Sequence, residues 1–292
     1  MNDRGKVTPL VSIIMNCYNS DRYLKEAIDS VYMQSYLNWE IIFWDNASTD
    51  RSSEIAKSYN DKLKYFKSKS TSLLGEARIF AVEKSKGEYL AFLDCDDYWY
   101  PKKLEKQMKI FSSDKDIAVV YSRAELFFED SGLKKIFPKK SKLKDGFIFE
   151  DLAKEDFIPF PSVVLDKEIF LSCGGFPIHF KCATDYWVLI HLALDFKFKA
   201  IQDVTCGYRI HDNNLSKSFA ITSGKESIEL ISKFLPDKRA VSGLRHQYVN
   251  LAISYFREKL FYRSLVILFR ERILYLGLKR IIKRLKNLLI NN

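Results

Sequence analysis

The sequence has few of the residues that interrupt regular structure, with only 7 prolines and 11 glycines among 292 residues. It also lacks internal repeats and low-complexity linkers, which argues against a fibrous or disordered chain. Hydrophobic residues make up 47% of the chain, enough to bury a substantial core. We therefore expect an ordered globular protein, built as one large domain or as a domain with an appendage.

Cysteine is scarce, and its pattern argues against disulfide or zinc cross-links. The five cysteines form an odd set without a C-x-x-C pair, and no spacing fits a zinc site. This usage is typical of a reduced chain in the cytosol. Cys17 and Cys95 are predicted to be small fillers near a ligand.

Long apolar runs are missing as well. No uninterrupted run approaches the roughly 20 residues that a membrane-spanning helix requires. The polar start, residues 1–6, lacks the apolar core of a signal peptide. We therefore expect that the chain does not cross a membrane by itself. The fingerprint G-x-G-x-x-G is absent after the first apolar run, which disfavours a dinucleotide-dependent dehydrogenase.

Acidic residues are rare at one end of the chain. The formal net charge is +10, and residues 256–292 supply ten basic and two acidic side chains, a net of +8. A nearly neutral body with a cationic tail favours attraction to an anionic surface and argues against a nucleic-acid partner. The basic residues of the tail are Arg257, Lys259, Arg263, Arg270, Arg272, Lys279, Arg280, Lys283, Arg284 and Lys286.

Strand-like and helical patterns alternate through the first 121 residues. Apolar runs of strand length are followed by polar loops and by apolar residues at helical spacing. This alternation predicts an α/β fold with a doubly wound, mostly parallel sheet and right-handed crossovers. The predicted strands are 10–15, 39–44, 63–67, 89–93 and 117–121, and the predicted helices are 24–34, 52–59, 74–84 and 104–111.

The rest of the chain is less regular. The lysine-rich stretch 134–144 is predicted to be a surface loop or hairpin, and the pattern is helical from Lys225 onward. Short strands are expected at 163–165, 199–202 and 207–211, with one helix ending at Cys173 and another starting near Asp185.

Three carboxylates, Asp94, Asp96 and Asp97, follow the apolar run 89–93. That run has the length and residue types of a strand buried on both faces, so the acids fall at a strand's carboxyl end, where open α/β sheets place their ligands. Crowded carboxylates repel one another unless a cation neutralises them, and Mg²⁺ or Mn²⁺ is usually held by one or two carboxylates plus phosphate oxygens. The cluster therefore indicates a metal-bridged nucleotide diphosphate; the alternative is a solvated acidic turn before Pro101.

Several short motifs accompany this cluster along the chain. They are Val11-Ser12-Ile13-Ile14-Met15-Asn16-Cys17-Tyr18-Asn19, Asp45-Asn46-Ala47-Ser48-Thr49-Asp50, Gly75-x-Ala77-Arg78, Lys86-Gly87-Glu88-Tyr89, Gly174-Gly175-Phe176, Ala183-Thr184-Asp185-Tyr186-Trp187 and Tyr208-Arg209-Ile210-His211. In this order they resemble the inverting family 2 glycosyltransferases with the GT-A fold, of the bacterial surface-polysaccharide type. The resemblance covers residues 9–218.

The resemblance implies a domain organisation. A GT-A catalytic domain would occupy residues 1–220, with a nucleotide-sugar half at about 1–121 and an acceptor half at about 122–220. Residues 221–292 would form a helical, basic and amphipathic extension.

The resemblance also implies a donor site at the carboxyl edge of the sheet. Asp96 is the expected ligand of Mn²⁺ or Mg²⁺, Asp94 is expected near the ribose, and Asp97 supports them. Asn16 and Cys95 are expected to contact the nucleotide sugar as well.

The base of the nucleotide would meet Tyr18 and Asp45. Tyr18 is suited to stack on a base, and Asp45 is suited to accept a hydrogen bond from uracil N3–H. Alternatively, Asp45, Ser48 and Asp50 only shape a turn and cap the helix that follows. Family members often have a second acid at the position of Asn46, which leaves the identity of the base open.

Arg78 and Asp185 have predicted roles in binding and catalysis. Arg78 can direct its charged fork at a diphosphate, and the alternatives are a surface arginine or a partner for the acidic cluster. Asp185 is the candidate general base, which takes the proton from the acceptor hydroxyl during inversion at the anomeric carbon. Its alternative role is to cap the helix that follows.

The remaining predicted site residues are Arg209, His211, Gly175, Trp99 and Trp187. Arg209 and His211 are predicted at the diphosphate, and His211 also as a metal ligand, although a lone histidine is often structural. The glycine and the two tryptophans are predicted to contact the acceptor. Their alternatives are a helix end for the glycine and core positions for the tryptophans.

Apolar and basic residues are interleaved from 255 to 289. Such segments lie in the interface of an anionic membrane, with the apolar face in lipid and the cations at the headgroups. The alternative is a helical hairpin that packs on the catalytic body with a solvated basic face. We predict membrane contact, which places the protein in the cytoplasm at the inner face of the cell membrane.

Taken with the residues, the resemblance implies a metal-dependent, inverting glycosyltransferase. It would move a hexose from a nucleotide diphosphate sugar, expected to be a UDP-sugar, to a hydroxyl of a glycan acceptor. The expected acceptor is a lipid-linked oligosaccharide of O-antigen or capsule-type polysaccharide synthesis. The alternatives are a nucleotidyltransferase and a GT-A module that binds a membrane or partner without catalysis.

Overall fold

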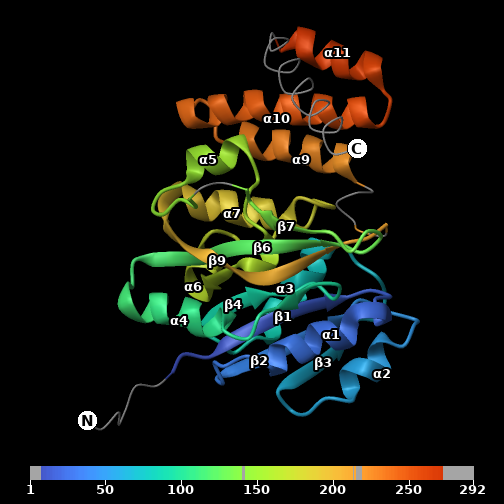
Figure 1. Cartoon of the computed structure of the whole chain (residues 1–292). Helices are drawn as coiled ribbons and strands as arrows, with labels where there is room; N and C mark the ends of the chain where they lie inside the picture. The colour runs from blue at the N-terminus through green and yellow to red at the C-terminus, as the bar shows by residue number, and fades with distance from the viewer. Residues whose placement is uncertain (1–7, 140–141, 213, 215–218, 272–292) are drawn as a thin grey trace. The chain divides into compact units, whose positions relative to one another are not determined.

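The computed structural model describes residues 8–139, 142–212, 214 and 219–271, and the chain forms two compact units (Figure 1). The first comprises Met1–Ile148, Phe157–Phe180 and His191–Asp212, and the second comprises Phe149–Asp156, Lys181–Ile190 and Asn213–Asn292. The domain boundary that we predicted after residue 220 stays a prediction.

The first four strands of the first unit are parallel. β1 pairs with β2 and with β4, and β2 pairs with β3. This confirms the predicted alternation, and it brings the carboxyl ends of β1, β2 and β4 to one edge of the sheet. The elements are β1 (Val11–Cys17), α1 (Asp21–Tyr32), β2 (Trp39–Asp45), α2 (Ser52–Lys57), β3 (Leu63–Lys67), α3 (Leu74–Lys84) and β4 (Tyr89–Phe92).

The second half of the sheet is mixed. The described strands follow the order β3-β2-β1-β4-β8-β6-β9-β5, and β7, the start of the lysine-rich stretch 134–144, pairs with β6 in an antiparallel hairpin. β6 is parallel to β9 and antiparallel to β8. The elements are β5 (Tyr98–Trp99), α4 (Lys103–Ser113), β6 (Ile117–Phe128), β7 (Lys134–Phe137), η1 (Phe160–Ser162), β8 (Val164–Asp166), α6 (Lys167–Ser172) and β9 (Lys197–Ile210).

The prediction of two strands at 199–202 and 207–211 was wrong, because both belong to β9. The ladder with β6 shifts register between the pairs Ser122–Ile201 and Arg123–Val204. Such a bulge interrupts the side-chain alternation without ending the strand.

A buried polar cluster fixes the start of β4 against β1. The hydroxyl of Ser12 donates to Glu40 (2.6 Å) and accepts from the backbone N–H of Gly87 (2.8 Å), while the N–H of Lys86 donates to Glu40 (2.7 Å). A Cβ at Gly87 would lie 2.6 Å from the carbonyl oxygen of Leu10 and from the nitrogen of Ser12. Only glycine fits at this position without a shift of the backbone.

The second unit is helical. Its helices α5, α9, α10 and α11 lie together, and α5, α9 and α11 each contact α10 (Figure 1). No helix within the described ranges is long and apolar enough to span a membrane. The elements are α5 (Phe149–Lys154), the first half of α7 (Thr184–Asp195), α9 (Ala220–Ser232), α10 (Lys238–Arg257) and α11 (Phe261–Arg270); predictions for 272–292 lie outside the described residues.

Lys103 is a fully buried lysine in the first unit, and we predict that it makes stability depend on pH. Its ammonium donates to Gln107 (2.8 Å) and lies 4.1 Å from the centre of the Trp99 ring. Burial lowers the pKa of Lys103 from 10.5 to about 7. Between these values the unfolded chain binds a proton that the folded chain lacks, so stability rises with pH, by at most about 1.4 kcal/mol per pH unit.

We expect Lys103→Met to stabilise the protein at pH 7 and below, with a gain that shrinks as the pH rises toward about 10. The measurement is denaturant unfolding of both proteins across this range. Lys102→Met, at an exposed neighbouring position, is the control and should leave the pH dependence unchanged. Parallel pH curves for wild type and Lys103→Met would show that Lys103 is not the responsible group.

Candidate active site

The loops after β1, β2 and β4 meet at the carboxyl edge of the parallel strands. Cys17 and Asp45 are partners in the β1–β2 ladder, and the N–H of Asn46 donates to the carbonyl of Cys17 (2.8 Å). The thiol of Cys95 donates to the carbonyl of Asn16 (3.3 Å). Cys17 and Cys95 are buried, as expected for small fillers. The structure thus brings the predicted donor-site residues of three strands together.

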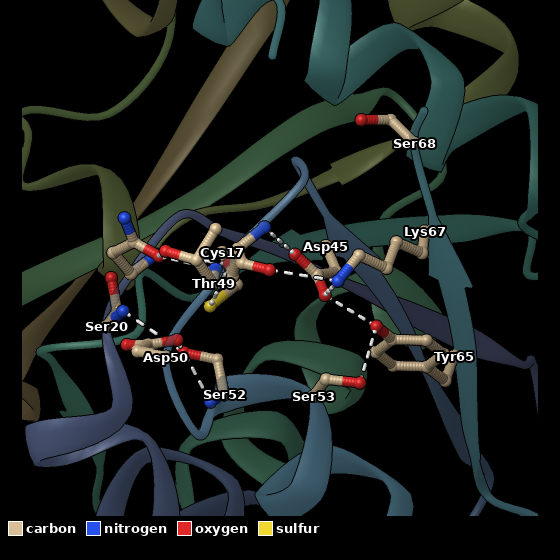
Figure 2. Close-up of polar contacts among 12 residues, drawn as sticks. Cys17, Ser20, Asp45, Thr49, Asp50, Ser52, Ser53, Tyr65, Lys67 and Ser68 are labelled. Atoms are coloured by element: carbon tan, nitrogen blue, oxygen red, sulfur yellow. Dashed lines mark hydrogen bonds and ion pairs between the residues drawn. The ribbon is translucent and has the colours of Figure 1, made fainter. Parts of the chain in front are cut away.

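Side chains of the first two loops fix each other's backbone (Figure 2). Asp50 accepts from the N–H groups of Asp21 and Ser52, both at 3.0 Å, and the hydroxyl of Ser52 accepts from the N–H of Ser20 (3.1 Å). Ser48 accepts from the N–H of Asn19 (3.1 Å). These contacts realise the turn-shaping role that the sequence left open for Asp50 and Ser48.

Asp45 is fully buried beneath these loops (Figure 2). It accepts from the N–H of Ser48 (2.6 Å) and the hydroxyl of Tyr65, and it lies 3.4 Å from the ammonium of Lys67. Burial alone would raise the pKa of Asp45, but the hydrogen bonds from Tyr65 and Ser48 outweigh burial and lower it. Both oxygens of Asp45 thus already accept hydrogen bonds within the protein, and its predicted hydrogen bond to uracil stays a prediction.

Asn46 and Tyr18 differ in their availability. The amide of Asn46 donates to the carbonyl of Ser72 (2.9 Å) and accepts from its N–H (3.1 Å), so it holds the segment that leads into α3. Tyr18 is 55% exposed and presents its ring at this edge. The amide of Asn46 is thus already hydrogen-bonded to the backbone, whereas the Tyr18 ring is accessible for stacking.

Asp94 is held by an arginine from α3. The guanidinium of Arg78 lies 3.2 Å from Asp94, and it is buried against the rings of Phe160 and Phe176, at 4.9 and 5.4 Å from their centres. The side chain of Asp94 is 42% exposed. Of the alternatives for Arg78, the structure shows the ion pair with the acidic cluster.

Asp96 lies against His211, which follows β9. Their side chains are 2.9 Å apart. Burial and the charge of Asp94 raise the pKa of Asp96, while His211 opposes this rise. The Asp96 carboxylate therefore lies between the negative charge of Asp94 and the imidazole of His211.

Asp97 is the most buried of the three acids. One oxygen accepts from the N–H of Arg209 (2.9 Å), and the other has no hydrogen-bond partner among the described residues. Burial, followed by the charges of Asp96 and Asp94, raises the pKa of Asp97 well above its usual value. Asp97 is thus a buried acid that connects this loop to β9, and its predicted supporting role stays a prediction.

Arg209 is directed at the acidic loop. Its guanidinium donates to the carbonyl of Asp96 (3.0 Å) and to Glu26 of α1 (2.6 Å), and it covers the ring of Tyr23 at 4.4 Å. The predicted contact of Arg209 with a diphosphate stays a prediction. The analysis of the sequence missed Glu26 and Tyr23, although their spacing of three residues places both on one face of α1.

The described residues contain no group of three or more His, Cys, Asp or Glu side chains placed to hold a metal ion. Asp96 and His211 are the two predicted metal ligands that the structure brings into contact. Two protein ligands fit a Mn²⁺ or Mg²⁺ ion that takes its other ligands from phosphate and water.

The structure changes the interpretation of Trp99 and Gly175. Trp99 is 2% exposed and its indole N–H donates to the carbonyl of Pro161 (2.9 Å), which favours the core alternative, and its predicted contact with an acceptor sugar stays a prediction. Gly175 has a φ of 63°, and its N–H donates to the carbonyl of Phe170 (3.2 Å). It therefore ends α6, and its acceptor contact stays a prediction.

Asp185 and Trp187 lie in the second unit, whereas the acidic cluster lies in the first. Asp185 is half-buried in the first turn of α7 and accepts from the N–H of Tyr186 (2.8 Å). Trp187 is half-buried, with the ammonium of Lys233 4.3 Å from its ring centre. The predicted roles of Asp185 as base and Trp187 as acceptor contact stay predictions.

The chain is similar to known glycosyltransferases. The profile of glycosyl transferase family 2 matches residues 12–160. An uncharacterized glycosyltransferase of Methanocaldococcus jannaschii is 34% identical over 72% of this chain and 74% of its own length. The Escherichia coli enzyme WfgD, a UDP-Glc:alpha-D-GlcNAc-diphosphoundecaprenol beta-1,3-glucosyltransferase, is 31% identical over 74% of this chain and 81% of its own.

The fold has solved counterparts. The structure of the mannosyltransferase PcManGT from Pyrobaculum calidifontis, in complex with GDP-Man and Mn²⁺, superposes with a TM-score of 0.62 at 16% identity, over 92% of this chain and 83% of that one. Identity this low shows the fold alone, and the fold is the GT-A arrangement that the motifs predicted. Profile, relatives and architecture agree, and the chain belongs to glycosyl transferase family 2.

Proposed function

We propose that the chain is a metal-dependent, inverting glycosyltransferase that moves a hexose from a UDP-sugar to a hydroxyl of a lipid-linked glycan. The observation that carries the proposal is the contact of Asp96 with His211 at the carboxyl edge of the sheet, in a chain of this family. The UDP-sugar and the lipid-linked acceptor are supported by the printed activity of WfgD, and the cation by the Mn²⁺ in the PcManGT complex.

In this proposal the residues of the first unit bind and orient the donor. Asp96 and His211 would hold Mn²⁺ or Mg²⁺, which when bound neutralises the charge of the diphosphate. Asp94, oriented by Arg78, faces the ribose with its exposed oxygens. Tyr18 stacks on the base. The buried carboxylate of Asp45 holds the loop after β2 in place through the N–H of Ser48.

Asp185 is the proposed general base. In a displacement with inversion, a carboxylate takes the proton from the acceptor hydroxyl as that oxygen forms its bond to the anomeric carbon. The nucleoside diphosphate leaves with its electron pair and needs no separate acid, unlike the leaving group of a glycosidase.

Asp96→Asn tests the donor site. We expect the affinity for UDP in the presence of Mn²⁺ to fall by about 100-fold, because the neutral amide is a poor ligand for the cation. Titration calorimetry with and without Mn²⁺ measures the effect. Asp203→Asn, which changes an acid that is 64% exposed, is the matched control. Mn²⁺-dependent affinity equal to that of wild type would remove Asp96 from donor binding.

Asp185→Asn tests the base. We expect it to bind UDP and Mn²⁺ like wild type and to lose turnover by about 100-fold or more, because only the proton acceptor is removed. Release of the nucleoside diphosphate is measured with GlcNAc-diphosphoundecaprenol as acceptor: UDP from UDP-glucose and UDP-GlcNAc, and GDP from GDP-mannose. Asp195→Asn, at the exposed end of the same helix, is the control. Normal turnover of Asp185→Asn would rule out the base.

We further propose that α11 contacts an anionic membrane surface on the cytoplasmic side. One face of this helix packs on α10 through Leu268 and through Ser264, whose hydroxyl donates to the carbonyl of Ala252 (2.8 Å). The opposite face exposes large apolar side chains beside the exposed Arg263. These side chains are Tyr262, Leu265, Val266 and Phe269, whereas the ring of Phe261 packs on Phe256 of α10 at 5.0 Å between ring centres. An apolar stripe next to basic residues suits the interface of anionic lipids.

Replacing Tyr262 and Phe269 together by serine tests this contact. We expect about tenfold weaker binding to vesicles of phosphatidylglycerol and phosphatidylcholine, because two aromatic side chains no longer enter the interface. Co-sedimentation measures the bound fraction. Ile178→Ser, which changes an exposed apolar side chain of the first unit, is the control. Equal binding of the double variant and wild type would contradict a role of α11.

A further inference from the structure

Glu226 of α9 holds the backbone directly before Asp185. Its carboxylate accepts from the consecutive N–H groups of Lys181, Cys182 and Ala183, at 2.7, 3.0 and 2.9 Å. Glu226 is 9% exposed, and all of these residues belong to the second unit. Three charge-assisted hydrogen bonds to one carboxylate therefore fix the point where α7 begins.

A second anchor lies directly after Asp185. The hydroxyl of Tyr186 donates to the carbonyl of Leu152 in α5 (2.7 Å) and accepts from the amide of Gln247 in α10 (3.1 Å). The same amide donates to the carbonyl of Ala153 (2.8 Å). Tyr186 and Gln247 are both buried. The backbone around Asp185 is thus held by α9 on one side and by α5 and α10 on the other.

The chemistry of these anchors explains why they restrict Asp185. Buried N–H groups that lose their acceptor are costly, so the loop before α7 has one favoured position while Glu226 is ionised and in place. A short aspartate side chain on this backbone has few rotamers and follows the position of its own Cα. An error of about 1 Å in such a group is large enough to lower a rate by about 100-fold.

We propose that Glu226 is a positioning residue for the transfer reaction, which sets the location of Asp185 without touching donor or acceptor. The proposal rests on the proposed role of Asp185 as general base. Glu226 lies outside residues 12–160, the part of the chain that the family profile matches. Under this proposal α9 contributes to catalysis, in addition to the membrane contact proposed for α11.

The test uses the full chain with Glu226→Gln, which keeps the shape of the side chain and removes its charge. We expect kcat for release of the nucleoside diphosphate to fall by about 10- to 100-fold with GlcNAc-diphosphoundecaprenol as acceptor and the fastest of the three donors. The affinity for UDP with Mn²⁺ should stay within about twofold of wild type, because the donor residues lie in the first unit. Glu229→Gln, at an exposed position of the same helix, is the control.

Two further measurements separate positioning from a general loss of structure. Amide hydrogen exchange at residues 181–183 should accelerate by at least about tenfold in Glu226→Gln, and Glu226→Asp, which keeps the charge, should recover part of kcat. In the background of Asp185→Asn, Glu226→Gln should cause no further loss, because the two act through one group.

The outcomes distinguish this proposal from the assignment of the base. Normal turnover of Glu226→Gln would overturn the positioning role while the base assignment stands. So would a loss of kcat from Glu226→Gln that is as large in the Asp185→Asn background as in wild type. Weaker binding of UDP and Mn²⁺ in proportion to the lost turnover would also overturn it. Normal turnover of Asp185→Asn alone would overturn the base assignment, and the positioning role with it.

Discussion

Repulsion among the three carboxylates after β4 is the constraint on which the first unit depends. Asp94, Asp96 and Asp97 each meet a different donor, one from α3 and two from the end of β9. Burial and the neighbouring acids raise the pKa of Asp96 and Asp97, and the donor that each of them meets opposes this rise. The sheet order and the 14 residues of β9 bring these donors to the acids.

Local patterns in the sequence were sufficient to predict the first half of the fold. The strand-length run that became β2 and the polar loop after it are signals contained within a few residues, so their positions could be predicted. β5 and α5 could not be predicted, because two and six residues carry no period of their own. These short elements depend on partners far away in the sequence, β9 and α10.

The candidate site could be predicted as a set of positions but only partly as a set of contacts. The motifs located the acids and Arg78, and the charge of Arg78 limited its partners to the acids or a phosphate. By contrast, the direction of the Arg209 side chain depends on Glu26, and the position of the Trp99 indole depends on Pro161. The role of Glu226 likewise depends on the loop before α7, whose N–H groups it accepts from. Periodicity and spacing carry no information about such distant pairs.

The lack of space beside Gly87 has a consequence for redesign. Because β4 cannot slide along β1, the carboxylates that follow it stay at a fixed height relative to the neighbouring loops. A change of sugar or base preference therefore has to come from exposed loop side chains such as Tyr18, while the strands and the side chains that hold the loops remain as they are. Redesign can therefore keep the strands unchanged and vary exposed side chains of the loops.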